Sequence, residues 1–204
     1  MTTLVKKRKR QRGIFAVEGE WMGDLRGGVS FRPLLELMRS LNKSPFVHRD
    51  AATREELNYY LKKWSQRRYS RYPILFLGYH GEAESIIIGD GRESDCRVTL
   101  TELMEWLEGC CDKRIIYIGS CSTMQIDERR LQSFLQCTGA LAICGYRNSV
   151  DMLRSAAFEL LLFNVLLGNT LTLNGAKAMK RKIEADERSL CKELGFRMVV
   201  RRNK

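Results

Sequence analysis

The sequence predicts an α/β domain, a three-layer sandwich in which a mostly parallel sheet of about six strands has helices on both faces. Strand-like and helix-like segments alternate along the chain, which is typical of this class. Two continuous apolar runs, residues 72–79 and 114–119, have the composition of central strands that are buried on both faces. The chain has 204 residues without an internal repeat or a low-complexity linker, so it fits one domain.

Apolar periodicity and helix-start signals define the elements of the first half. Thr53 and Glu56 have the Thr-x-x-Glu spacing of a capping box, which satisfies free backbone N–H groups in the first helical turn. Pro33 fits the first turn of the preceding helix, where its missing N–H is not needed. The predicted elements are a strand at 13–17, a helix over about 30–41, a short strand at 46–47, a helix over about 53–66 and a buried strand at 72–79.

The second half continues this alternation. Residues 85–88 and 97–100 are predicted to form a hairpin, and Thr101 is expected to cap the short helix after it. Residues 13–204 therefore form the predicted domain, and residues 1–12 a basic, disordered tail before it. The remaining predicted elements are a buried strand at 114–119, a helix over about 127–136, a strand at 140–144, a loop at 145–151, a helix ending at 167, a helix over about 174–190 and a final strand at 196–200.

Two reactive side chains follow the two buried strands: His80, with Gly81 after it, and Cys121. Ligands of open α/β sheets bind at the carboxyl ends of the strands, so both side chains are expected at one edge. A cysteine attacks as its thiolate, and a nearby imidazole promotes ionisation and then protonates the leaving amine. The backbone N–H groups of Gly81 and Cys121 are predicted to form an oxyanion hole. A cysteine at a strand end is more often a small buried residue, but this joint placement favours a catalytic pair.

An apolar block ending in His-Gly, followed by an apolar block ending in Cys, resembles the caspase-like superfamily of cysteine peptidases. This superfamily includes caspases, gingipains, separase and the bacterial CHAT proteases. The resemblance implies a caspase-like sandwich fold and a cysteine endopeptidase that needs no cofactor and acts on a protein substrate. Besides the dyad it is carried by Phe15-Ala16-Val17 through Arg26-Gly27, which resemble the first strand and loop of caspases, and by residues 138–146, Val150-Asp151, Phe158 and Leu167-Gly168, which resemble the carboxyl-terminal half of CHAT proteins.

The resemblance implies selectivity for the residue before the scissile bond, and two interpretations of that pocket are open. In separase-like and CHAT relatives an acid in the loop after the post-cysteine strand binds Arg or Lys, and Asp151 matches it. In caspases arginines bind Asp, and Arg26 and Tyr146-Arg147 resemble those positions. We favour Asp151, hence cleavage after a basic residue. The alternative roles are a helix N-cap for Asp151 and ordinary exposed loop positions for the arginines.

The formal net charge of +11 is unevenly distributed, because six positive charges lie in the first twelve residues. A solvated tail is the ordinary interpretation, and contact of this tail with nucleic acid or a membrane surface is the alternative. A second alternative function is a catalytically silent caspase-like module that binds a protein. Because the chain has one predicted domain, activation is expected to come from a partner protein or from cleavage. The basic residues of the tail are Lys6, Lys7, Arg8, Lys9, Arg10 and Arg12.

Composition also bears on the compartment. The seven cysteines are odd in number and lack the spacing of zinc ligands, which favours reduced thiols in a cytoplasmic protein. No membrane span is predicted, because the most apolar stretch, residues 156–167, is short and contains Glu159 and Asn164. The second histidine, His48, is expected at the surface, and the three tryptophans in the core or at its rim.

Overall fold

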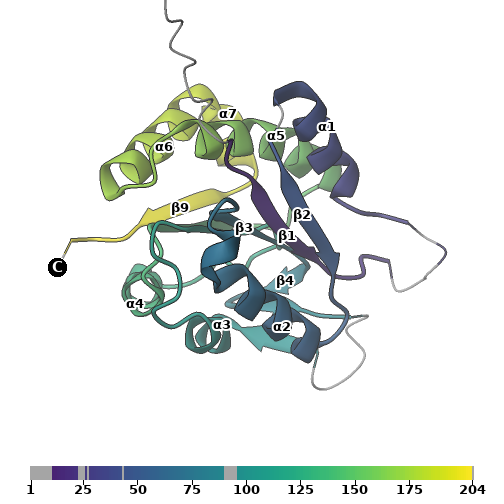
Figure 1. The fold of residues 1–204 in the computed structure, drawn as a ribbon. Coiled ribbons are helices and arrows are strands. Elements are labelled where there is room, and N and C mark those ends of the chain that lie inside the picture. Colours follow the sequence, from purple (N-terminus) through teal and green to yellow (C-terminus); the bar gives the residue numbers. More distant parts are fainter. Residues whose placement is uncertain (1–10, 23–25, 27, 43, 90–95, 204) are drawn as a thin grey trace, which may run out of the picture.

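A computed structural model describes residues 11–22, 26, 28–42, 44–89 and 96–203. Its centre is a six-stranded sheet with the order β2-β1-β3-β7-β8-β9 (Figure 1). All neighbouring pairs are parallel except β8 and β9, which are antiparallel. The mostly parallel α/β sheet that the sequence predicts is therefore confirmed. Its strands are β1 (Ile14–Glu18), β2 (Phe46–Asp50), β3 (Ile74–Gly78), β7 (Ile115–Ile118), β8 (Ala142–Tyr146) and β9 (Phe196–Val200).

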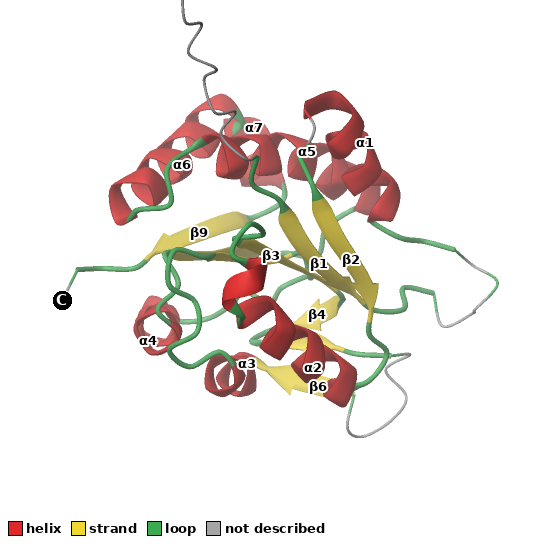
Figure 2. Ribbon diagram, viewed as in Figure 1, coloured by secondary structure: helices red, strands yellow, loops and turns green. Residues whose placement is uncertain are grey.

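Helices cover both faces of this sheet (Figure 2). One face packs against α1, α5, α6 and α7, and the other against α2, α3 and α4. Each face has its own apolar core, one around Phe76 and Phe163 and the other around Leu77 and Trp64. The helices are α1 (Arg32–Asn42), α2 (Arg54–Ser65), the short 3₁₀ turn η1 (Arg67–Tyr69), α3 (Leu100–Trp106), α4 (Glu128–Thr138), α5 (Met152–Gly168), α6 (Leu173–Asp186) and α7 (Arg188–Glu193).

A second, three-stranded antiparallel sheet lies on the side of α2 and α3. Its strands β5 (Ser85–Ile87) and β6 (Arg97–Thr99) confirm the predicted hairpin. The third strand, β4 (His80–Glu82), was not predicted. It begins at His80, so this side chain stands where the chain leaves the central sheet for the small one.

Several predicted boundaries are corrected by the structure. The cap of α3 is Thr99, which forms a capping box with Glu102, and not Thr101. Strand β8 continues through Gly145 and Tyr146, which were predicted to begin the loop, because both residues pair with β9. The predicted helix over 174–190 is two helices, α6 and α7, with Glu187 between them at φ −117° and ψ 37°. The short strand at 46–47 extends to Asp50 because it pairs with β1 along its whole length.

Most of the predicted basic tail, residues 1–10, lies outside the described residues. Within the described part, the Gln11 carbonyl accepts a 3.0 Å hydrogen bond from Arg71 Nε, and Arg12 bonds the Asn169 carbonyl. These two residues therefore contact the domain. Among the described residues, no helix is both long and apolar enough to cross a membrane.

Candidate active site

His80 and Cys121 follow neighbouring strands. Strands β3 and β7 lie side by side and run parallel, with Leu77 opposite Ile118. His80 begins β4 directly after the buried Tyr79, and Cys121 lies in the turn that follows β7. Because parallel neighbours end at the same edge of a sheet, both candidate residues emerge at the carboxyl edge, where α/β folds bind their ligands.

The segments that carry the two residues are in contact through Gly81. A Cβ atom built on Gly81 would lie 2.6 Å from the Cys121 carbonyl oxygen and 2.6 Å from Thr123 Oγ1. Any side chain at this position would therefore collide with the turn that holds the cysteine. Glycine thus has a packing reason here, in addition to the oxyanion role that the sequence predicts for its N–H group.

Hydrogen bonds fix the turn around Cys121. Ser122 has a φ of 58°, a left-handed conformation that is uncommon for a residue with a side chain. Its N–H donates to the Asn148 carbonyl at 3.0 Å, and Thr123 Oγ1 donates to the Cys121 carbonyl at 3.2 Å. Residues in such conformations persist where the surroundings enforce them, and they concentrate at functional sites.

Two donors from the loop after β8 point at the cysteine sulfur. The Val150 N–H lies 3.4 Å from Cys121 Sγ, and the Ser149 hydroxyl lies 3.8 Å from it. Donors directed at sulfur stabilise the charged thiolate more than the neutral thiol. The sequence analysis names Val150 only as part of the resemblance and does not name Ser149, and it predicts no contact of either with the sulfur, because their position depends on β7 and β8 being neighbours.

The His80 ring is oriented by Trp21, in the loop after β1. His80 Nε2 lies 2.8 Å from the Trp21 carbonyl oxygen, and the two rings meet edge to face with centroids 5.4 Å apart. A carbonyl oxygen only accepts hydrogen bonds, so Nε2 carries the proton and the lone pair of neutral imidazole resides on Nδ1. Trp21 was expected only as a core or rim aromatic, and its role at His80 was not predicted.

The candidate pocket residues lie in different settings. Asp151 is exposed and is the N-cap of α5, because its Oδ1 accepts the Arg154 N–H at 2.9 Å. Arg147 and Arg26 are exposed. Tyr146 is 0% exposed in the core, which is incompatible with contact between its side chain and a substrate, so we remove it from the candidate pocket.

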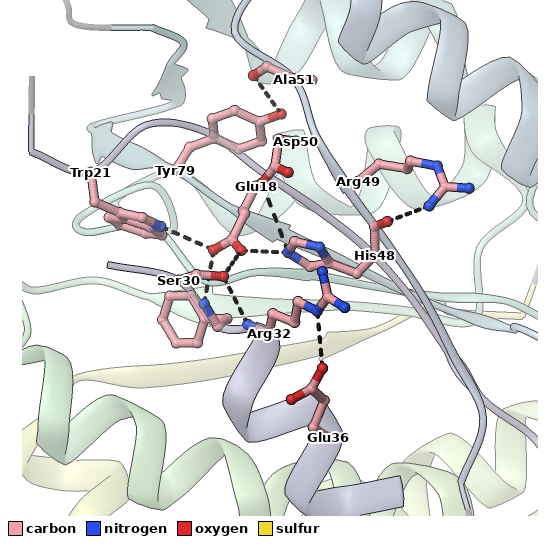
Figure 3. Close-up of polar contacts among 11 residues, drawn as sticks. Glu18, Trp21, Ser30, Arg32, Glu36, His48, Arg49, Asp50, Ala51 and Tyr79 are labelled. Carbon is pink, nitrogen blue, oxygen red and sulfur yellow. Dashed lines mark hydrogen bonds and ion pairs between the residues drawn. The ribbon is translucent and has the colours of Figure 1, made fainter. Parts of the chain in front are cut away.

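The sequence predicts His48 at the surface, and this prediction is wrong. The His48 side chain is only 9% exposed, and Nε2 bonds the carboxylate of the buried Glu18 (Figure 3). The reason is the register of β1 and β2, which pairs His48 with Ala16 and so places Glu18 two residues farther along the same face. Asp50 Oδ1 lies 4.0 Å from His48 Nε2, and these three side chains are close enough to share a metal ion.

Comparison with known protein families identifies the family of this chain. A family model described as a family of unknown function (DUF6642) matches residues 11–200. The chain belongs to DUF6642. Among curated proteins no match to it was found. The matched range contains both sheets and both members of the candidate dyad, and the family description assigns no activity.

In this DUF6642 chain a buried acid lies beneath the candidate site. Glu159 of α5 is 0% exposed, and its Oε1 accepts from the Tyr117 hydroxyl at 2.7 Å and lies 3.4 Å from the Tyr146 hydroxyl. Burial raises the pKa of Glu159 to about 8, although the two tyrosine hydroxyls act in the opposite direction. Among the described residues Oε2 has no hydrogen-bond partner. Glu159 therefore holds its proton at neutral pH and fastens α5 to β7 and β8.

Proposed function

We propose that the protein is a cysteine endopeptidase of the caspase-like type, with His80 and Cys121 as its catalytic dyad. The observation that carries the proposal is the close packing of Gly81 on the Cys121 turn, at the shared edge of two parallel strands. It brings the segments of the two predicted residues together. The donors at the Cys121 sulfur and the fixed proton on His80 Nε2 give further support.

The proposed reaction uses groups of the chain itself. The Cys121 thiolate attacks the peptide carbonyl, and the N–H groups of Gly81 and Cys121 stabilise the oxyanion that forms. His80 accepts the thiol proton at Nδ1 and passes it to the leaving amine, while Nε2 remains bonded to the Trp21 carbonyl. Water, deprotonated by the same imidazole, then attacks the acyl-enzyme; the bond to Cys121 Sγ breaks, the second product leaves with a carboxyl group, and the proton on His80 returns to the thiolate.

We further propose cleavage after Arg or Lys, with Asp151 binding the basic side chain. Asp151 is exposed and directly follows Val150, whose N–H reaches the cysteine sulfur. Its carboxylate already caps α5 through one oxygen, Oδ1. A carboxylate has room for more than one donor, so the second oxygen is suited to a substrate cation. The opposing model, cleavage after Asp by way of Arg147 and Arg26, is separated by experiment.

The dyad is tested with Cys121→Ala and His80→Ala. Both variants should lose hydrolysis of peptide substrates, because each lacks one member of the dyad. A thiol-reactive peptidyl probe should label Cys121 much more slowly in His80→Ala. Both variants should stay folded, since the two residues lie at the sheet edge. Cys110→Ala is the matched control, since this thiol is exposed. Near-normal turnover in either dyad variant would contradict the assignment. Slow labelling and no turnover in the unmodified protein would favour a silent binding module.

Selectivity is tested with Asp151→Asn, which removes the charge but keeps a good N-cap residue. Turnover of substrates with Arg or Lys before the scissile bond should fall on the order of a hundredfold, since a truncated charged contact costs roughly 2–5 kcal/mol. Thermal stability should stay within a few degrees. A preference for Asp that is lost in Arg147→Ala and kept in Asp151→Asn would overturn the basic selectivity and leave the dyad in place.

A further inference from the structure

A buried carboxylate lies beside the proposed dyad, at the same edge of the sheet. Glu18, the last residue of β1, is 1% exposed and accepts hydrogen bonds on both oxygens. Oε2 accepts the Trp21 indole N–H at 3.1 Å and the Phe31 backbone N–H at 2.9 Å. Oε1 bonds the Ser30 hydroxyl and His48 Nε2 (Figure 3). Four donors from three segments of the chain therefore converge on this one side chain.

These donors keep Glu18 charged. Burial raises the pKa of Glu18, but the hydrogen bonds from His48, Ser30, Phe31 and Trp21 outweigh burial and hold the pKa below its ordinary value of 4.5. The site is therefore a preformed anion that holds the loop after β1 at both of its ends. Its amino end is held through Trp21, and its carboxyl end through Ser30 and Phe31.

Trp21 connects this anion to His80. Its indole N–H is bonded to Glu18, its ring packs edge to face on Phe31 at 5.3 Å, and its own carbonyl accepts from His80 Nε2. A tryptophan that is fixed through its side chain has little freedom to rotate its carbonyl. The direction of that carbonyl sets both the tautomer and the plane of the His80 ring.

We infer that Glu18 is a positioning residue for His80 and acts through Trp21. This inference rests on the proposed dyad and extends it, because it assigns the orientation of the general base to a carboxylate that does not touch it. In the reaction cycle the imidazole gains and loses a proton at Nδ1 while Nε2 stays bonded. A carbonyl held by Glu18 and Trp21 keeps the Nε2 proton in place through that cycle and leaves the lone pair of Nδ1 for the thiol proton.

A bound cation is the competing explanation of the same cluster. The ligand atoms of Glu18, His48 and Asp50 lie within 4.8 Å of one another. However, the Glu18 oxygens already accept from four donors, and a metal ion would have to displace the His48 contact to bind Oε1. The Asp50 side chain is 81% exposed, and it is not one of the four groups that bond Glu18. Asp50→Asn therefore removes the negative charge of a potential metal ligand, which should weaken cation binding, and leaves the network intact.

The test measures alkylation of Cys121 by iodoacetamide, followed by mass spectrometry of the peptide that contains it, from pH 5 to pH 9. In Trp21→Phe and Glu18→Gln the rate at pH 7 should fall about tenfold toward that of His80→Ala, and its rise with pH should move to higher pH. Trp21→Phe keeps the carboxylate and the other three donors, so it remains informative if Glu18→Gln unfolds. Combined with His80→Ala, neither change should lower the rate further, because each acts through that residue.

Two controls match these variants. The Trp64 indole N–H donates to the Tyr72 backbone carbonyl at 2.7 Å, away from the site. Trp64→Phe removes this N–H and should keep the normal rate of Cys121 alkylation. Asp50→Asn should also keep it, with or without EDTA. A rate that falls with EDTA, returns with Mn²⁺ and is lost in Asp50→Asn would assign the cluster to a metal and overturn the inference.

The outcomes separate this inference from the dyad itself. If His80→Ala leaves the alkylation rate of Cys121 unchanged, the proposed function fails and the positioning role fails with it. If His80→Ala slows alkylation but folded Trp21→Phe and Glu18→Gln both keep the normal rate and pH profile, only the positioning role is overturned. The ¹⁵N shifts of the His80 ring give a readout independent of reaction, and should show loss of the Nε2–H tautomer preference in Trp21→Phe.

Discussion

Glu18 and Glu159 are both buried on the same sheet, yet their surroundings drive them to opposite charge states. Glu18 is 1% exposed and its pKa lies below the ordinary value of 4.5. Glu159 is 0% exposed, and burial raises its pKa to about 8. Burial disfavours the charged form at both positions, so burial alone does not decide the outcome.

The difference lies in the donors that each carboxylate receives. Four groups bond the two oxygens of Glu18, and three of them, from Trp21, Ser30 and Phe31, belong to the loop that reaches His80. Glu159 has phenol hydroxyls near one oxygen, and the other oxygen has no partner among the described residues. The anion of Glu18 also contributes to raising the pKa of Glu159. A sheet of this kind can therefore hold one charged acid near its site and one neutral acid beneath it.

The same substitution at the two positions should give the largest contrast. Glu18→Gln replaces an acceptor of four donors with a group that is itself partly a donor, so it should lower the free energy of unfolding at pH 7 by about 3–5 kcal/mol. Because the folded pKa is lowered, this contribution is present above pH 4.5 and is lost as pH falls through the folded pKa. Urea unfolding at pH 7 and pH 3.5 measures it, and an equal loss at both pH values would show that Glu18 is not charged in the fold.

Glu159→Gln should have a smaller effect with the opposite dependence on pH. Between pH 4.5 and about 8 the folded protein binds a proton at Glu159 that the unfolded chain has released, so stability declines as pH rises. The variant should be within about 1 kcal/mol of the unmodified protein at pH 5 and should gain on it by up to roughly 1.4 kcal/mol per pH unit toward pH 8. Urea unfolding at three pH values tests this, and a constant difference would mean that Glu159 is ionised.

The smallest expected effect comes from Tyr146→Phe, which removes one hydroxyl of the Glu159 network. The loss should be about 1 kcal/mol at pH 6, and it should grow at pH 8.5, since a lost donor raises the pKa of Glu159 further. Tyr59→Phe serves as the control, because this ring is 55% exposed. If Tyr146→Phe and the control have the same free energy of unfolding at both pH values, the Tyr146 hydroxyl does not stabilise the Glu159 network.

Local patterns were reliable where one strand or one cap suffices. The final strand was predicted at the residues where β9 lies, and the Thr53 capping box is present. At the start of α3 the Thr-x-x-Glu signal belongs to Thr99, since Glu102 stands three residues after it, whereas Met104 follows Thr101 at that spacing. The start of α3 at Thr99 is therefore encoded in the local sequence, and the prediction of Thr101 as the cap is wrong.

Other boundaries needed the tertiary structure. Gly145 was predicted to begin a loop, as glycine often does, but it lies in β8 between β7 and β9. A Cβ atom there would lie 2.5 Å from the Ile118 carbonyl oxygen, so the close approach of two strands requires glycine. Nothing in the local sequence distinguishes this strand glycine from a turn glycine.

Apolar runs and caps are local signals, so the α/β class, the order of most elements and the two segments that carry His80 and Cys121 could be predicted from the sequence. The tertiary structure was needed to show that Trp21 reaches His80, that Val150 reaches the cysteine sulfur and that the partly buried His48 bonds Glu18. These contacts join residues that lie 29 to 59 positions apart in the sequence. Their physical cause is the order and register of strands β2, β1, β3, β7 and β8, which bring their carboxyl ends to one edge.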